Sequence, residues 1–186
     1  MKHIFSLWGM MAILAGQAQA IGLEITLAGE VEGEVTIDLF QNSAPNHVER
    51  IVTLAREGKY DGVVFHRVIE GNFAQTGDIV YGNFHRNLNM SMTGKGGSDL
   101  GLLELELSDV LFQRGVVGMA RREGLDTADS QFFILLVDTD ELVGEYTAVG
   151  RVTSGMELID QIKIGEGENG EVYGWPDRME TVKVID

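Results

Sequence analysis

The chain has 186 residues, no cysteine and a formal net charge of −15 at neutral pH. This charge argues against nucleic acid and against an anionic membrane surface as partners, because both repel an acidic protein. The absence of cysteine excludes disulfides and thiol chemistry, so the fold has to be stabilised by a hydrophobic core.

The first 20 residues have the features of a secretory signal peptide. Lys2 gives a basic start, an apolar block follows over residues 4–15, and Ala18 and Ala20 form an A-x-A-like cleavage site. An uncleaved membrane anchor is the alternative, but the block is shorter than the ~20 residues that a spanning helix needs. We therefore expect cleavage after Ala20, export to a periplasm and no stable membrane association afterwards. The remaining residues 21–186 suit a single domain.

The next two elements are a hairpin and a helix. Apolar residues alternate in "LEITL" (23–27) and in "VTIDL" (35–39), which predicts two strands joined by a glycine-bearing turn. In "NSAPNHVERIVTLAREGKYDG" the period changes to that of a helix, with Pro45 suited to the first turn and Gly58 to the end. Its apolar positions are Val48, Ile51, Val52 and Ala55.

Short strands dominate the rest of the chain. We expect them at residues 63–69, 72–77, 115–120, 131–137, 147–152 and 181–185. A second helix, "GMELIDQIKI", is expected at 155–164. Many short strands with few helices indicate a closed barrel, which leaves no exposed sheet edge. The 81–114 segment is the least regular part, and such a long excursion is either functional or mobile.

Several kinds of site lack their sequence signature. There is no HExxH, no CxxC and no acidic calcium loop, so a metal site has little support. No GxSxG or P-loop occurs, and "TGKGG" lacks the ending of a phosphate-binding Walker motif.

Five segments in order resemble the cyclophilin family of peptidyl-prolyl cis-trans isomerases. They are "YDGVVFHRVIEGNFAQTGD", "TGKGGS", "RGVVGMARR", "ADSQFFI" and "YTAVGRV". The resemblance covers nearly all of residues 21–186 and implies a mostly β fold, a closed eight-stranded antiparallel barrel capped by two helices. It also implies a groove for proline-containing polypeptides on the outer face, and an enzyme without a cofactor.

The resemblance assigns roles to particular residues. Arg67 matches the catalytic arginine, Gln75 the substrate-positioning glutamine and Phe133 the aromatic floor of the proline pocket. The substrate-binding positions that it implies are Asn72, Phe73, Ala120, Arg121, Gln131, Leu142 and Tyr146.

Elementary chemistry explains why an arginine suits this reaction. Resonance holds the Xaa-Pro bond planar, and its loss on rotation turns the prolyl nitrogen into a hydrogen-bond acceptor. A guanidinium is always charged and presents several donors in a rigid fork. Its interaction with that nitrogen grows in the transition state, which is the kind of interaction that accelerates a reaction.

Two positions depart from the family pattern. Asn72 stands where the family has a pocket phenylalanine, with Phe73 one place later. Either Asn72 faces the groove while Phe73 occupies the neighbouring wall position, or a bulge shifts the strand so that Phe73 fills the pocket and Asn72 sits in the loop. Glu141 stands where many relatives have an aromatic residue linked with cyclosporin binding, and we interpret it as a solvated rim residue.

Three functions are compatible with these observations. The leading one is an exported, monomeric prolyl isomerase that assists the folding of exported proteins. The second is a proline-peptide-binding chaperone module with weak turnover, and the third is a cyclophilin-like partner-binding domain with none. An isomerase assay separates the first from the others, and peptide titration separates the second from the third.

Overall fold

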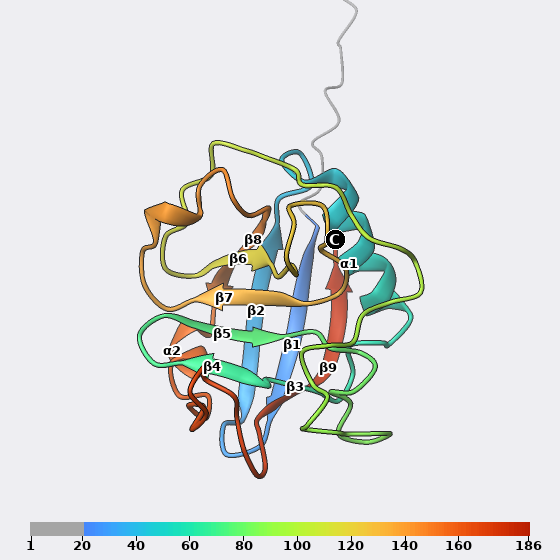
Figure 1. The fold of residues 1–186 in the computed structure, drawn as a ribbon, viewed down its shortest axis with the longest axis vertical. Coiled ribbons are helices and arrows are strands. Elements are labelled where there is room, and N and C mark those ends of the chain that lie inside the picture. Colours follow the sequence, from blue (N-terminus) through green and yellow to red (C-terminus); the bar gives the residue numbers. More distant parts are fainter. Residues whose placement is uncertain (1–20) are drawn as a thin grey trace, which may run out of the picture.

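The computed structural model describes residues 21–186, so the predicted signal peptide lies outside the described residues. Nine antiparallel strands form one sheet in the order β3-β9-β1-β2-β8-β6-β7-β5-β4. Figure 1 shows the sheet curled, with β7, β5 and β4 crossing in front of β1, β2 and β9 at a large angle. The fold is therefore mostly β, as expected. Over the same residues, no helix is both long and apolar enough to cross a membrane.

The strands are short, as the sequence pattern predicted. Their bounds are β1 Gly22–Ala28, β2 Gly33–Leu39, β3 Val63–Val64, β4 Arg67–Ile69, β5 Phe73–Thr76, β6 Val116–Met119, β7 Phe132–Leu135, β8 Ala148–Ser154 and β9 Arg178–Ile185. β1 and β2 form the predicted hairpin, in which Ile25 pairs with Val35.

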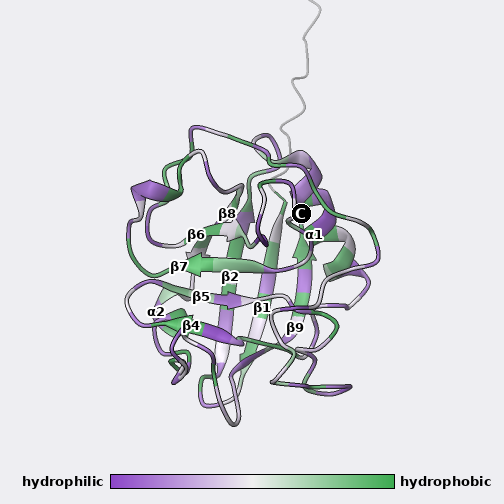
Figure 2. Ribbon diagram, in the orientation of Figure 1, coloured by the Kyte–Doolittle hydropathy of each residue, from purple (hydrophilic) through white to green (hydrophobic). Residues whose placement is uncertain are grey.

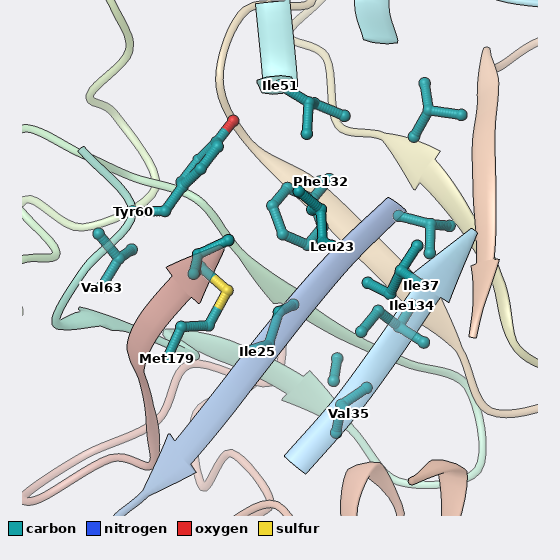
Figure 3. Close-up of a cluster of buried hydrophobic side chains, with 14 of the residues drawn as sticks. Leu23, Ile25, Val35, Ile37, Ile51, Tyr60, Val63, Phe132, Ile134 and Met179 are labelled. Carbon is teal, nitrogen blue, oxygen red and sulfur yellow. The ribbon is translucent and has the colours of Figure 1, made fainter. Parts of the chain in front are cut away.

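The interior of the curled sheet is filled by apolar side chains. Figure 3 shows Ile25 of β1 and Val35 of β2 in the same cluster as Ile134 of β7 and Met179 of β9. In β7 every residue is buried, and Figure 2 shows this strand hydrophobic along its length. A strand buried on both faces loses the alternation that marks a half-exposed strand, so β7 reads as a continuous apolar run.

The prediction of a closed eight-stranded barrel was wrong in its strand number and its closure. The expected strand over 63–69 divides into β3 and β4, which lie at opposite ends of the sheet. The division arises because Phe65 N donates to Asp177 O, whereas the next amide, His66 N, donates to Gln75 O. No ladder of the described residues joins β3 to β4, so the sheet is a curled half-barrel whose two edges are consecutive in the chain.

Two α-helices accompany the sheet, as predicted. α1 (Pro45–Arg56) begins at Pro45 and buries its predicted apolar face, and Gly58 follows its end at a positive φ of 64°. α2 covers only Met156–Ile159, less than the predicted 155–164. It stops early because the chain is drawn away where Lys163 N donates to the buried carboxylate of Asp177 at 2.8 Å. A short 3-10 helix, η1, spans Asp140–Leu142.

The long irregular segment contains no named strand or helix between residues 81 and 114, as the sequence indicated. It is nevertheless fixed to α1. Glu106 accepts backbone hydrogen bonds from Asn46 and His47, both at 3.1 Å, and so caps a helix that has no side-chain cap of its own. Buried Arg50 donates to Gly101 O at 2.9 Å and to Asp129 Oδ1 at 2.8 Å.

Candidate functional site

Three neighbouring strands bring the predicted catalytic residues into one row. Arg67 on β4 pairs with Gln75 on β5, and Gln75 pairs in turn with Phe133 on β7. Directly paired residues of adjacent strands point to the same face of a sheet. Residues separated by dozens of positions in the sequence therefore meet on one outward face.

A cavity of about 340 Å³ opens beside this row. Its lining residues are Arg67, Asn72, Phe73, Gln75, Ala120, Arg121, Phe133, Thr139, Leu142 and Tyr146. The structure thus brings together every predicted site residue except Gln131, which is hydrogen-bonded to Gln75. The residues come from β4, β5, β7, η1 and the connecting loops.

Arg67 is held by two hydrogen bonds. Its Nε donates to Asn169 O at 2.8 Å and its Nη1 donates to Gln75 Oε1 at 3.3 Å. The loop that supplies Asn169 is braced, because Asn169 N and Nδ2 both donate to the carboxylate of Glu171. These bonds lower the pKa of Glu171, so its carboxylate stays charged beside Arg67. Arg67 Nη2 has no hydrogen-bond partner among residues 21–186 and remains available to a ligand.

A chain of amides sets the orientation of Gln75. Gln131 Nε2 donates to Gly96 O at 2.8 Å, which leaves Gln131 Oε1 to accept from Gln75 Nε2 at 3.0 Å. Gln75 Oε1 is then turned toward Arg67. Gln131 therefore acts on the cavity through Gln75 instead of lining the cavity itself.

Aromatic rings form the apolar side of the cavity. Phe133 is 6% exposed, and its ring centroid lies 5.9 Å from that of Phe73 and 5.6 Å from that of Tyr146. The rings are tilted or edge-on, as aromatic pairs prefer. Gly118 of β6 pairs with Phe133, and a Cβ atom at Gly118 would collide with the Phe133 ring. The glycine inside this strand thus makes room for the floor of the cavity.

The strand ladders bear on the two placements of Asn72 and Phe73. The β4–β5 and β5–β7 ladders run without a bulge, and Phe73 begins β5 two residues before Gln75, on the same face. Phe73 also lies under Arg67, whose Cζ is 4.8 Å from the ring centroid. Asn72 is exposed at the turn before the strand and forms part of the cavity rim. Phe73 therefore forms part of the cavity wall, and β5 needs no bulge to place it there.

Charged residues border the cavity on the side of Tyr146. The Cζ of Arg121 lies 4.5 Å from the Tyr146 ring centroid, and Arg121 Nε donates to Glu145 O at 3.1 Å. Glu141 is exposed on η1 and does not line the cavity, in agreement with its interpretation as a solvated residue.

A buried histidine lies behind the row. His66 is 4% exposed, and neither ring nitrogen has a hydrogen-bond partner among residues 21–186. Burial lowers the pKa of His66 to about 4, although the nearby carboxylate of Asp78 acts in the opposite direction. His66 is therefore neutral at pH 7.

Some contributors were missed by sequence reasoning. Asn169 acts through its backbone carbonyl, which no residue pattern reports. Gly118 did carry a signal, because a glycine inside a strand often marks close approach of another group. Thr139 lines the cavity from the loop after β7 and has no pattern around it. Within the described part of the chain, no group of three or more histidine, aspartate or glutamate side chains could hold a metal ion.

Comparison with known proteins agrees with this geometry. Residues 23–184 match the family model described as "Cyclophilin type peptidyl-prolyl cis-trans isomerase/CLD". A Brucella suis protein named "Probable peptidyl-prolyl cis-trans isomerase" is 48% identical over 149 residues, which cover 80% of this chain and 76% of the relative. A Helicobacter pylori "Peptidyl-prolyl cis-trans isomerase" is 41% identical over 138 residues, 73% of this chain and 78% of the relative.

Solved structures share the fold. A crystal structure of a Cryptosporidium parvum cyclophilin type peptidyl-prolyl cis-trans isomerase superposes with a TM-score of 0.74 at 23% identity, covering 90% of this chain and 99% of the other. A second structure of that protein, in the presence of the dipeptide Ala-Pro, gives a TM-score of 0.72 at 22% identity, covering 89% and 99%.

Proposed function

Because the chain belongs to the cyclophilin-type peptidyl-prolyl cis-trans isomerases, we propose that Arg67 and its cavity accelerate rotation about Xaa-Pro bonds in exported polypeptides. The isomerase activity follows from the family. The observation that carries the assignment of the site is the row of Arg67, Gln75 and Phe133 beside the cavity.

The reaction needs little from the protein except position and charge. Rotation breaks no covalent bond, so it requires no nucleophile, metal or cofactor. The barrier is about 18–20 kcal/mol, because the amide resonance is lost as the bond twists. A site that binds the twisted bond more tightly than the planar one lowers that barrier.

Each element of the site has a part in this scheme. The proline ring rests on Phe133 between Phe73 and Tyr146, in an apolar setting that matches the ring. The free Nη2 of Arg67 donates to the prolyl nitrogen as its lone pair develops. Gln75 keeps one amide hydrogen for a neighbouring substrate carbonyl, so one side of the bond is anchored while the other turns.

An isomerase assay on a short peptide with one Xaa-Pro bond tests the activity. We expect cis-to-trans conversion that depends on enzyme concentration and is strongly reduced in Arg67→Ala. Arg56→Ala is the matched control, because Arg56 is an exposed arginine on α1, away from the cavity. Peptide binding without turnover would instead support the binding-module alternative.

The cellular setting is part of the proposal. The signal-peptide features of residues 1–20 support export, and we propose the periplasm as the destination. There residues 21–186 would act as a monomeric domain on proline-containing chains as they fold, without nucleic acid. Intact mass of the exported protein should correspond to a chain that begins at Ile21. A membrane-bound form that still carries Met1 would contradict export by this route.

A further inference from the structure

A second cavity, of about 450 Å³, adjoins Arg67 and Gln75. Arg67 and Gln75 line both cavities. One wall of the second cavity comes from the segment Met90 to Lys95, within the long irregular part of the chain. A peptide whose proline occupies the first cavity therefore has neighbouring residues within reach of the second.

The wall of this cavity is fixed by a single buried carboxylate. Asp78 is fully buried, and its Oδ1 accepts from Val80 N and Tyr81 N at 3.1 and 2.8 Å. Its Oδ2 accepts from Gly94 N and Gly96 N at 2.7 and 2.9 Å. The C-terminal end of the segment is thus tied to the same carboxylate as the backbone of residues 80 and 81. The wall formed by this segment is therefore held in place by the fold, although the segment has no regular secondary structure.

This arrangement sets the backbone of Lys95 between the two tied glycines. Lys95 N donates to Met92 O at 3.2 Å, and Lys95 O accepts from Arg122 Nη2 at 3.3 Å. The side chain is exposed, and within residues 21–186 no carboxylate lies within 4.0 Å of its Nζ in an ion pair. Its charge is available to a ligand.

Among the residues that line the cavity two are cations and one is an acid, and the buried carboxylate of Asp78 lies behind the wall, bonded to backbone amides. Glu171 is the acidic residue of the lining, and both of its oxygens accept hydrogen bonds from Asn169. Arg67 and Lys95 are the cations. His66 at the floor adds no charge at pH 7, because burial keeps it neutral.

We propose that the second cavity is a substrate subsite that selects an aspartate or glutamate side chain close to the proline, with Lys95 as the residue that determines this preference. The proposal rests on the proposed function of the first cavity. A carboxylate is the side-chain group whose charge and acceptor oxygens complement an ammonium beside a guanidinium.

Matched peptides test the proposal. A series of Xaa-Pro peptides carries Glu at one flanking position at a time, and each has a partner with Gln at that position. We expect the ratio of kcat/KM for Glu over Gln to reach about two- to tenfold at one position, the range for a partly exposed charge contact. The preference should shrink as salt is raised from about 0.02 to 0.5 M, because salt screens exposed charges.

Variants of the chain make the test specific. Lys95→Gln should bring the ratio close to one, and Lys95→Glu should invert it, whereas Lys59→Gln, an exposed lysine outside both cavities, should leave it unchanged. Using a ratio for each enzyme cancels any general loss of activity. A wild-type ratio of one at every position, or an unchanged ratio in Lys95→Gln, overturns the proposal.

Failure of the subsite proposal can be distinguished from failure of the isomerase assignment. If neither peptide of a pair is turned over, the proposed function fails. The binding constants of the same pairs, measured by anisotropy of labelled peptides, then test the subsite alone. A Glu preference in binding that disappears in Lys95→Gln supports the subsite, and equal binding overturns it.

Discussion

Arg67 and Gln75 are paired across β4 and β5 and are also joined through their side chains, with Nη1 donating to Oε1 at 3.3 Å. The ladder fixes the two backbones, and the amide chain from Gly96 through Gln131 fixes the direction of the Gln75 amide. The guanidinium is therefore oriented before any substrate arrives. Such preorganisation is the property that electrostatic stabilisation of a transition state requires.

Replacing Arg67 should affect catalysis far more than stability. Arg67→Ala removes a charged hydrogen bond to the twisted amide, which should cost about 2–4 kcal/mol, or roughly a 30- to 1,000-fold loss in kcat/KM. Arg67→Lys should rescue little, since it keeps the charge and loses the fork. Peptide kinetics and urea unfolding of the three proteins check this. Wild-type turnover in a folded Arg67→Ala would refute the mechanism.

Phe73 and Asn72 should differ sharply when they are changed. Phe73→Ala removes a wall that contacts Phe133 and Arg67, so activity should be nearly abolished. Asn72→Phe should do little, because Asn72 belongs to the exposed turn at the rim. Both variants are compared in one peptide assay. A strong gain in kcat/KM from Asn72→Phe would show that Asn72, and not Phe73, faces the proline ring.

Gly118→Ala should disturb the floor of the cavity from beneath, because Gly118 itself does not line the cavity. The new methyl group has to displace the Phe133 ring, and a shift of about 1 Å at a site of this kind can cost on the order of a hundredfold in rate. Gly101→Ala is a suitable control, since Gly101 has a φ of 85° but open space around it. The control should lose stability and keep kcat/KM. Equal kinetic effects in the two variants would argue against a special role for Gly118.

His66 should make stability fall as the pH is lowered from about 6.5 to about 4. In this range an unfolded histidine binds a proton, whereas the folded protein resists it because burial lowers the pKa of His66 to about 4. The contribution of neutral His66 to stability is fully present above pH 6.5 and is lost as the pH falls toward about 4. The negative charge of Asp78 favours protonation of His66, and the positive charge of Arg67 opposes it.

Urea unfolding of wild type and His66→Gln at pH 7.5 and pH 5 measures this effect. The variant should lose less stability between the two pH values. Some dependence will remain, because burial also lowers the pKa of His47. An identical pH dependence in both proteins would contradict the assignment to His66.

The sequence predicted those features that arise from local patterns. The alternation in β1 and β2 and the helical period of α1 were sufficient for those elements, and the ordered motifs led to Arg67, Gln75 and Phe133. The separation of β3 from β4 was not predictable, because neighbouring residues Phe65 and His66 bond to strands far away in the chain. The hydrogen bond from Arg67 to Asn169 was equally hidden, since the acceptor is a main-chain oxygen. The form of the second cavity depends on Asp78, whose four bonds include two across a long loop.

The position of β9 has a consequence for how the protein is made. β9 is translated after every other strand of the sheet, yet it pairs with β1, the earliest strand, and with β3. While β9 is still within the ribosome, β1 lacks one of its neighbours and β3 lacks its ladder. Native pairing of this sheet thus follows synthesis of all nine strands, and sequence separations this large slow the pairing of β1 with β9. An emerging chain therefore stays incompletely paired until the residues of β9 have been synthesised.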